Sequence, residues 1–411
     1  MTKVSPRKVR VIGAGFSGLL AAHYLRNRGF EVEVFEAEAR SGGLLQTHRL
    51  PWGLAETAAN GFLANLEIES VADAVGCELE PARRASRRRF FFRAGRARQW
   101  PFRFFEGVGV IVRLFFAWIF RFLAPIEGES VATWGRRVGG PAFVRWLLAP
   151  ALSGIYAAAP ERLSAPLLLR RFFGQKFKAP KRGRLRGLVA PRHGMGDFVA
   201  KLEASLRARD VAFRFGRGVT AAEAQGWAAA GGVVWAVPLP AAVDALTTLS
   251  PVLAAALGRV GRIGLVSVTA FFDPRPSDLR GFGCLFPRGE GVVALGALFN
   301  AEIFEGRGEL RSETWIYSHA DVPRDDAIVV EQLAADRLRL GGATKAAPLG
   351  VRVQRWPFAL PVYDEALAAA LARPEWASLE RAGHYFVGNY RGSLGLSRLI
   401  GAVRATVEAI A

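Results

Sequence analysis

A glycine pattern close to the N-terminus most constrains how this chain can fold. Residues 9–12 are apolar and predict a short buried strand, and Gly13, Gly15 and Gly18 follow it. In a G-x-G-x-x-G turn, the first glycine allows the bend and the second lets the backbone approach a pyrophosphate. The third lets the next helix pack closely against the strand. The pattern therefore predicts a dinucleotide-binding βαβ unit.

An acidic residue at the expected distance strengthens this prediction. Residues 17–27 are expected to form a helix and residues 31–36 a second strand, which ends at Glu36. A carboxylate about 20 residues after the glycines is placed to bind the ribose hydroxyls of a dinucleotide. Phe16 and Ser17 would lie at the helix N-terminus, where backbone N–H groups face the pyrophosphate.

Composition narrows the classes of partner and of chemistry. Lysine and arginine number 55 against 36 acidic residues, a net charge of +19, which favours anionic small molecules, anionic lipid or nucleic acid. Cys77 and Cys284 are too few for a disulfide framework and lack metal-ligand spacing, so we expect an intracellular, metal-free protein. The five histidines stand in no hydrolase or zinc-protease motif.

Further segments resemble the FAD enzymes of the amine oxidase, phytoene desaturase and protoporphyrinogen oxidase superfamily. Residues 37–43 resemble their extended fingerprint, and residues 387–396 resemble their second FAD segment. Val219 matches a position whose backbone meets adenine, although an ordinary sheet valine explains it equally well. Trp356 begins a stretch similar to the one that lies against the flavin. The resemblance implies FAD as cofactor, held by Gly13, Gly15, Phe16, Ser17, Gly18, Glu36, Ala37, Arg40, Gly42, Gly43, Val219, Trp356, Gly388, Asn389, Gly395 and Leu396.

One branch of this superfamily, the protoporphyrinogen and coproporphyrinogen oxidases, is similar over most of the chain. Residues 153–164 resemble its signature, a Ser-Gly-aromatic turn followed by Pro-Glu and Leu-Ser. Some positions depart from the pattern: Ala158 and Ala159 replace a usual Gly-Asp, and His193 replaces a glycine. Residues 397–398 stand where an acidic residue is usual. These departures leave the identity of the substrate open.

The resemblance implies a reaction in heme or tetrapyrrole biosynthesis. Flavin N5 would take hydride from a porphyrinogen in three rounds, six electrons in all, and O2 would reoxidise the flavin. Because the cofactor carries the difficult step, no catalytic side chain is assigned. Two alternatives remain: an FAD-dependent desaturase or amine oxidase acting on another hydrophobic substrate, and a non-catalytic flavin-fold protein that binds tetrapyrrole.

The patterns and the resemblance together imply an α/β fold. We expect a Rossmann-like, glutathione-reductase-type FAD-binding domain built from residues 1–82, 188–260 and 366–411. An interleaved α+β substrate domain is expected at 261–365, and a mainly helical insertion rich in aromatic and arginine residues at 83–187. Further expected elements are a helix at 197–209 and strands at 211–215, 232–238, 264–272 and 292–299.

The most apolar part of the insertion, residues 101–125, could meet a membrane. Arg103, Glu106, Arg113 and Arg121 interrupt it, so no uncharged run approaches the ~18 residues that a spanning helix needs. A core-packed helix and an interfacial or substrate-channel helix are both consistent with its pattern, and the arginines favour contact with anionic lipid. The apolar face is expected to hold Val108, Ile111, Val112, Phe115, Ile119, Phe122 and Leu123.

These observations predict a cytoplasmic protein that is peripheral on the inner face of the cell membrane. Its expected partners are a hydrophobic, anionic small molecule and O2. The basic, phenylalanine-containing stretch at 175–186 carries no recognised nucleic-acid motif, so we expect no nucleic acid. The oligomeric state stays open, with a homodimer as one option.

Overall fold

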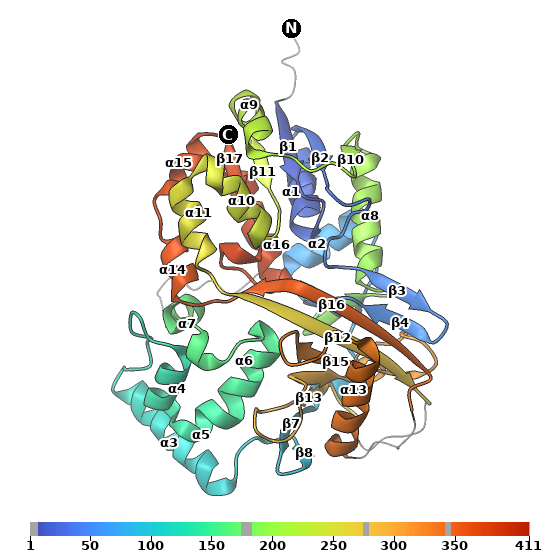
Figure 1. Cartoon of the computed structure of the whole chain (residues 1–411), viewed down its shortest axis with the longest axis vertical. Helices are drawn as coiled ribbons and strands as arrows, with labels where there is room; N and C mark the ends of the chain where they lie inside the picture. The colour runs from blue at the N-terminus through green and yellow to red at the C-terminus, as the bar shows by residue number, and fades with distance from the viewer. Residues whose placement is uncertain (1–6, 174–182, 274–278, 342–346, 411) are drawn as a thin grey trace.

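Two sheets organise the molecule. The computed structural model describes residues 7–173, 183–273, 279–341 and 347–410. One sheet lies toward each end of an elongated molecule, and the long strands β12 (Arg262–Phe272) and β16 (Gly350–Pro361) cross its middle (Figure 1). Residues 175–182 of the basic stretch considered for nucleic acid lie outside the described residues.

The first sheet has five parallel strands in the order β10-β2-β1-β11-β17. Its strands come from three separated parts of the sequence, as expected for a nucleotide-binding domain interrupted by insertions. Parallel strands place all their carboxyl ends at one edge, so the loops that follow them meet there. The strand bounds are β1 (Lys8–Ile12), β2 (Glu31–Phe35), β10 (Ala212–Arg214), β11 (Val233–Trp235) and β17 (His384–Phe386).

Helices cover both faces of this sheet. Alternation along β1 sends Val11 into one core and Ile12 into the other. The first core packs against α1 (Phe16–Asn27), α2 (Leu66–Ala74), α8 (Met195–Arg207) and α16 (Leu396–Glu408). The second packs against α9 (Ala221–Ala230), α10 (Leu239–Leu249), α11 (Pro251–Gly258), α14 (Glu365–Leu371) and α15 (Glu375–Arg381). The predicted α/β class is confirmed.

The second sheet has seven strands in the order β16-β12-β15-β14-β13-β7-β8. Neighbouring strands run antiparallel except β13 and β7, which are parallel. One face packs on α13 (Asp326–Leu340), where Val268 and Trp315 meet Leu333. The remaining strand bounds are β7 (Arg89–Arg93), β8 (Arg96–Arg98), β13 (Gly283–Leu285), β14 (Gly296–Leu298) and β15 (Arg311–Ser318).

The insertion is helical, but it also contributes to the second sheet. The expectation of a mainly helical segment from residue 83 missed β7 and β8, which lie inside it. Alternation explains β7, because Phe90 and Phe92 point into the core of the sheet while Arg89 stays exposed. The helical elements are η1 (Arg84–Arg87), α3 (Phe104–Ile119), α4 (Val131–Gly139), α5 (Pro141–Phe143), η2 (Val144–Leu148), α6 (Ala149–Tyr156), η3 (Pro160–Arg162) and α7 (Ala165–Phe173).

Four expected elements differ in their bounds from the structure, and the strands expected at 211–215 and 232–238 are reduced to β10 and β11. The helix expected at 197–209 begins and ends two residues earlier, as α8. The strand expected at 292–299 is reduced to β14. The buried carboxylate of Asp336 accepts hydrogen bonds from the backbone N–H groups of Val293 and Ala294, at 3.2 and 3.0 Å, so these groups do not join the strand ladder.

Short elements fill the space between the two sheets. The hairpin β3–β4 lies beside β16 (Figure 1). A small sheet in the order β5-β9-β6 lies where the first and second parts of the nucleotide-binding region meet. The bounds are β3 (Thr47–Leu50), β4 (Gly53–Glu56), β5 (Phe62–Leu63), β6 (Leu79–Pro81), β9 (Leu188–Pro191), α12 (Asn300–Ile303) and η4 (Asn389–Arg391).

Candidate functional site

The turn between β1 and α1 contains two glycines that are required by close contacts within the protein. Gly13 has φ +99°, and a Cβ there would lie 2.5 Å from the carbonyl oxygen of Ala236. A Cβ at Gly18 would lie 1.8 Å from the carbonyl oxygen of Gly13. Both contacts are far inside van der Waals distance, so the close approach of α1 to the strand depends on these two glycines.

Gly15 is different, because nothing in the protein demands a glycine there. Its backbone is extended, with φ −70° and ψ 179°, and no atom lies within 4 Å of a Cβ added to it. Gly15 is also the N-cap of α1, which has no side-chain cap and no acidic residue in its first turn. The helix start is therefore free to bind an anion, and a missing side chain leaves room for one.

Phe16, Ser17 and Gly18 form the first turn of α1 and are buried. The ring of Phe16 packs against Phe62 and Phe198, with centroids 6.0 and 6.1 Å apart. This packing fixes the helix start. The backbone of this turn, rather than its side chains, is what a ligand would meet.

Glu36 lies directly after β2 and is held by backbone donors. Its Oε2 accepts from the N–H of Ala14 at 2.6 Å, and its Oε1 accepts from the N–H of Glu38 at 2.9 Å. Each oxygen keeps a further lone pair for a ribose hydroxyl. The N–H of Arg217 donates to the Glu36 carbonyl at 2.9 Å, which brings the loop carrying half-buried Val219 beside this carboxylate.

Residues 40–43 lie across from Gly15. Gly42, at φ +99°, forms an isolated parallel bridge with Gly15, and its N–H donates to the Ala14 carbonyl at 2.8 Å. The half-exposed guanidinium of Arg40 contacts the Glu38 carboxylate at 3.0 Å and the Gly43 carbonyl at 3.2 Å. Two bare backbone stretches thus face one another beside a cation, which suits a pyrophosphate. Ala37 is exposed at the rim.

The third part of the nucleotide-binding region, at residues 388–396, resembles the first in having a helix that starts at a glycine without a side-chain cap. Gly388, at φ +152°, lies two residues after the end of β17, and the Asn389 carbonyl accepts a hydrogen bond from the Tyr363 hydroxyl at 2.5 Å. Gly395 is the N-cap of α16, with φ −71°, no atom within 4 Å of an added Cβ, and no acidic residue in the first turn that half-buried Leu396 begins. Since α1 follows β1 and α16 follows β17, both uncapped helix starts lie at the carboxyl edge of the parallel sheet.

The second sheet reaches this edge through β16. Trp356 Nε1 donates to the Thr57 carbonyl at 2.7 Å, which ties β16 to the loop after β4. Farther along, the ring of Tyr363 lies 5.3 Å from that of Tyr156 at the end of α6. Burial raises the pKa of both phenols, so they stay neutral at physiological pH and can act only as hydrogen-bonding and packing groups.

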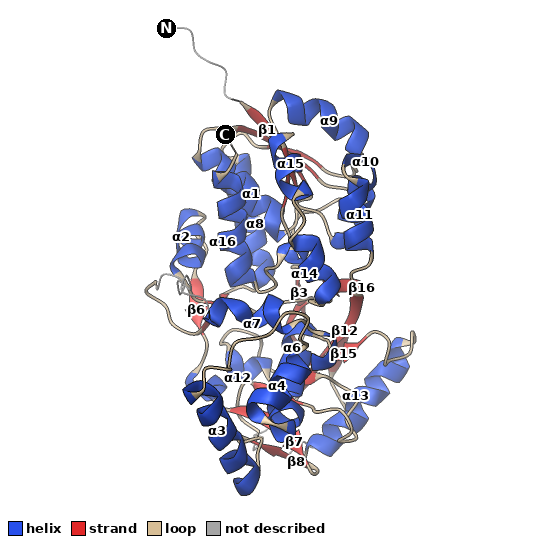
Figure 2. Ribbon diagram, turned by 90° about the vertical axis from the view of Figure 1, so that its left-hand side faces the viewer, coloured by secondary structure: helices blue, strands red, loops and turns tan. Residues whose placement is uncertain are grey.

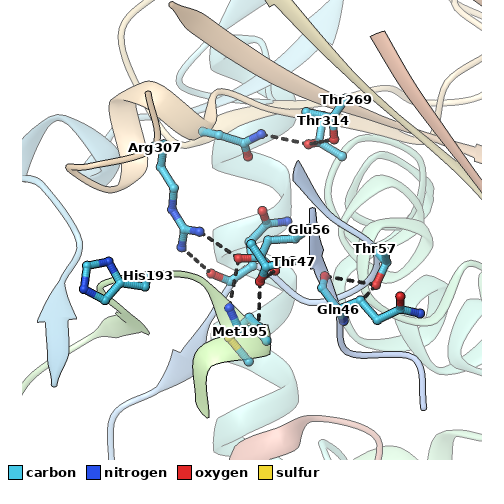
Figure 3. A network of polar contacts seen from close by, with 12 residues as sticks. Gln46, Thr47, Glu56, Thr57, His193, Met195, Thr269, Arg307 and Thr314 are labelled. Atoms are coloured by element: carbon cyan, nitrogen blue, oxygen red, sulfur yellow. Dashed lines mark hydrogen bonds and ion pairs between the residues drawn. The ribbon is translucent and has the colours of Figure 1, made fainter. Parts of the chain in front are cut away.

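A buried ion pair that the sequence did not predict joins the hairpin β3–β4 to the loop that precedes β15 (Figure 3). Glu56 Oε1 accepts from Arg307 Nη1 at 2.7 Å and from the Met195 N–H at 3.0 Å, and its Oε2 accepts from the Thr47 hydroxyl at 2.7 Å. These hydrogen bonds hold together β3, β4, the start of α8 and the loop before β15. The sequence around Glu56 and the sequence around Arg307 give no sign of the pair, because the two residues lie 251 positions apart.

The structure brings the predicted cofactor residues of all three segments to one edge, with Trp356 beside them. His193 stands apart from the buried pair and is exposed in the turn before α8, as expected for a turn residue (Figure 3). Both cysteines are free and buried. Among the described residues, no group of three or more His, Cys, Asp or Glu side chains is arranged for a metal ion.

Comparison with known proteins agrees with this geometry. A family model for an NAD(P)-binding Rossmann-like domain matches residues 11–74. A chloroplastic protoporphyrinogen oxidase from Nicotiana tabacum is 27% identical over an alignment that covers 95% of this chain and 83% of the tobacco protein.

Solved structures share the fold over the whole chain. A protein from Exiguobacterium sp. 255-15, provisionally named a protoporphyrinogen oxidase, superposes with a TM-score of 0.78 at 18% identity, covering 99% of each chain. Cyclohexylamine oxidase from Brevibacterium oxydans gives a TM-score of 0.73 at 16% identity, covering 98% of each chain. The resemblance inferred from the motifs is confirmed: the chain is an FAD-dependent oxidoreductase that is similar to protoporphyrinogen oxidases and shares the fold of amine oxidases.

Proposed function

We propose that this enzyme oxidises a porphyrinogen to the porphyrin, protoporphyrinogen IX to protoporphyrin IX, in heme or tetrapyrrole biosynthesis with O2 as electron acceptor. The supporting observation is that the similarity to the tobacco protoporphyrinogen oxidase covers 95% of this chain. It therefore includes the substrate sheet and the insertion as well as the nucleotide-binding segments. When bound, FAD would accept two electrons in each of three rounds, and the protein's task is to bind and orient.

The residues at the carboxyl edge fit FAD as an elongated anionic dinucleotide. The starts of α1 and α16, with the bare backbone at Gly15 and Gly395, would face its charged groups. The Glu36 carboxylate would accept from the ribose hydroxyls, and Arg40 would neutralise part of the pyrophosphate charge.

A row of residues on the second sheet would form one wall of a site for a macrocycle. In register across the strands stand Ser267, Ile316, Gly296 and Leu285. Trp315 and its neighbours on the other face pack on α13, so this row points the opposite way, toward the insertion. A Cβ at Gly154 of α6 would lie 2.7 Å from Leu285, so that helix closes directly on the wall.

Aromatic side chains border the same region. The half-buried rings of Trp356 and Tyr156 would offer surfaces on which a conjugated or pyrrolic macrocycle can stack, and the buried ring of Tyr363 supports that of Tyr156. Because burial raises the pKa of the Tyr156 phenol, it stays protonated and could donate a hydrogen bond without adding negative charge beside the substrate's carboxylates. The wall and these rings would hold the macrocycle and keep water from it.

Anaerobic mixing tests the proposed reaction. The purified yellow protein is combined with protoporphyrinogen IX, coproporphyrinogen III or cyclohexylamine while the visible flavin absorption is followed. Rapid bleaching by a porphyrinogen, followed by porphyrin fluorescence on admission of air, is expected. Bleaching by the amine alone, or by none of the three, would contradict the proposed substrate while leaving the cofactor assignment intact.

The proposal includes peripheral contact with the cytoplasmic membrane surface, in keeping with a hydrophobic substrate. Within the described part of the chain, no helix combines the length and apolarity that crossing a bilayer requires. The supporting features are the net charge of +19 and the apolar helix of the insertion.

A further inference from the structure

Two polar side chains interrupt the row of residues that faces α6. Ser267 of β12 stands in register with Gln354 of β16 on one side and with Ile316 of β15 on the other. Ser267 points away from the core that packs on α13, because Val266 and Val268 on either side of it belong to that core. In Figure 2, α6 lies on one side of β12 and β15, and α13 lies on the other. Ser267 and Gln354 therefore belong to the face that we propose for the macrocycle.

The polar side chains of the next row are satisfied by one another. Thr269, two residues farther along β12 on the same face, is only 2% exposed. Its hydroxyl is hydrogen-bonded to that of Thr314 at 2.8 Å, and Asn300 Nδ2 donates to the Thr314 hydroxyl at 2.8 Å (Figure 3). Buried hydroxyl groups are normally paired in this way. The next row is therefore part of the protein interior and offers no free group to a ligand.

Ser267 and Gln354 differ from these threonines in burial and in bonding. Both are half-buried, and the Ser267 hydroxyl has no hydrogen-bonding partner among the described residues. Gln354 Nε2 donates to the Arg355 carbonyl at 3.2 Å, which leaves the amide oxygen as the atom free for a ligand. A hydroxyl and an amide oxygen, each with lone pairs to offer, thus stand next to each other in the row.

The surroundings of this pair are electrically neutral. The row that runs from Gln354 to Leu285 contains no charged residue, and neither does α6. Arg352, two residues before Gln354 on β16, lies beside His48 of the hairpin, with 3.3 Å between Nη2 and Nε2. Its guanidinium is therefore directed at the hairpin. Neutral acceptors in a half-buried, mostly apolar row suit a neutral N–H donor, which needs no opposite charge to offset its loss of hydration.

Strand β16 brings the pair toward the nucleotide-binding edge. Trp356, two residues after Gln354 and on the same face, donates from Nε1 to the Thr57 carbonyl at 2.7 Å. The Thr57 hydroxyl in turn donates at 2.6 Å to the carbonyl of Leu44, the residue after Gly43. A short series of contacts thus connects the pair with the glycines that face the start of α1.

We propose that Ser267 and Gln354 position the substrate by accepting hydrogen bonds from its pyrrole N–H groups. The assignment rests on the proposed porphyrinogen oxidation and names residues that select for this class of substrate. A porphyrinogen carries neutral N–H donors within an apolar ring, and the row sets its two acceptors beside the apolar side chains of Ile316 and Leu285. A substrate without these N–H groups would leave both acceptors unpaired, and a site of this kind discriminates strongly against such a compound.

Rapid anaerobic mixing of the yellow protein with protoporphyrinogen IX tests the pair. The rate of flavin bleaching is measured at increasing substrate concentration, which gives a half-saturating concentration and a limiting rate. Gln354→Leu removes the amide at nearly constant size and should raise the half-saturating concentration roughly tenfold, the equivalent of one lost hydrogen bond. The limiting rate should change by less than about threefold, because a neutral hydrogen bond made on binding acts mainly on affinity.

Two substitutions at Ser267 isolate the hydroxyl from the shape of the side chain. Thr and Val have nearly the same shape, and both suit a strand, but only Thr carries a hydroxyl. Ser267→Thr should therefore keep a half-saturating concentration within about twofold of wild type, whereas Ser267→Val should raise it roughly fivefold. Equal values for the two variants would show that the hydroxyl does not contact the substrate, which overturns the assignment for Ser267.

The dimethyl ester of protoporphyrinogen IX distinguishes pyrrole N–H groups from carboxylates as the partners of the pair. The ester keeps the N–H groups and lacks the two carboxylate charges. Gln354→Leu should weaken the binding of the diacid and of the ester by the same factor. A loss confined to the diacid would show that the pair donates hydrogen bonds to carboxylates, and the proposed role would then be wrong.

Gln332→Leu is a matched control on the opposite side of the sheet. Gln332 Nε2 of α13 donates to Asp336 at 2.9 Å, so this substitution also removes an amide and one hydrogen bond. The control should keep the half-saturating concentration of wild type. Flavin absorption and circular dichroism establish that each variant is folded and carries the cofactor.

The outcomes separate the pair from the reaction itself. If Ser267→Val and Gln354→Leu are half-saturated at the same concentration as wild type, the assignment of the pair is wrong while the proposed reaction stands. A loss confined to the limiting rate has the same meaning, because a contact made on binding must change the half-saturating concentration. If no porphyrinogen bleaches the wild-type flavin, the proposed reaction is wrong and the assignment of the pair falls with it.

Discussion

The starts of α1 and α16 contrast with α3 in what each helix leaves unsatisfied. At α1 and α16 the apolar side chains are buried, and the backbone N–H groups of the first turn lack a side-chain cap. At α3 the first turn is capped by Glu106, and the apolar side chains are exposed. A helix start open to anions suits phosphate, and an open apolar face suits acyl chains. The unsatisfied group therefore indicates the chemistry of the partner.

The largest effect is expected at Gly15, where we propose that the cofactor binds. Gly15→Val should abolish FAD retention, because the side chain would occupy the position of the diphosphate. The apoprotein should still fold, since the backbone at Gly15 is extended and a Cβ there meets open space. Absorption spectroscopy and circular dichroism of the purified variant measure both properties.

Gly18→Val is the matched control for this variant. A Cβ at Gly18 would collide with the Gly13 carbonyl, so this change should unfold or strongly destabilise the protein rather than only release FAD. A Gly15→Val protein that stays yellow with stoichiometric flavin would contradict the cofactor placement.

The next effect concerns the anchor of α3. Arg93→Ala should lower the free energy of unfolding by about 2 kcal/mol, because it leaves Glu106 without its partner and removes packing on Trp146. Arg136→Ala removes an ion pair in which both side chains are about half exposed, and should change stability by at most about 0.5 kcal/mol. Equal urea midpoints for the two variants would show that Arg93 does not anchor the helix.

Acid should affect the nucleotide-binding region through His23. Burial, and then repulsion by Arg209, lower the pKa of His23 from 6.5 to about 4. Between pH 6.5 and 4, His23 is protonated in the unfolded chain but neutral in the folded protein. The free energy of unfolding therefore falls by about 2 kcal/mol as the pH drops through this window. In His23→Gln that contribution is absent, and urea unfolding at pH 7 and pH 4.5 should reveal a smaller loss than in wild type.

The smallest effect is expected on the exposed face of α3. Phe105→Ser should change the free energy of unfolding in buffer by no more than about 0.5 kcal/mol, because the ring is 85% exposed. Phe92→Ala, in the buried part of the same insertion, should cost roughly 3–5 kcal/mol. A large loss from Phe105→Ser would mean that the ring stabilises the fold and is not reserved for a partner.

Local patterns carried the prediction of the nucleotide-binding edge, because its residues act through backbone conformation. Gly13 and Gly18 are required by a turn and a packing contact that lie within a few residues, and Gly15 leaves room for the proposed ligand beside them. The sequence could not decide whether the α3 segment is a core-packed or an interfacial helix, because both kinds of helix have the same apolar periodicity. Only the structure shows that its expected apolar face, including Ile111 and Phe115, is exposed.

Other features could not be predicted because they depend on residues that are distant in the sequence. The pair of Glu56 and Arg307 forms across 251 residues, and neither charge has a local signature. The carboxylate of Asp336 removes Val293 and Ala294 from a strand that their own sequence favours. The insertion was predicted to be separate from the second sheet, because nothing in the sequence near Phe90 indicates that β7 pairs with β13 at Cys284.

That pairing has a practical consequence for engineering. The helical part of the insertion cannot be transplanted as a cassette with boundaries at residues 83 and 187, because the cut would take β7 and β8 with it and strip the edge from β13. An unprotected strand edge invites aggregation. A graft that exchanges α3 between relatives should therefore be joined after Arg98, so that the recipient keeps its own sheet intact.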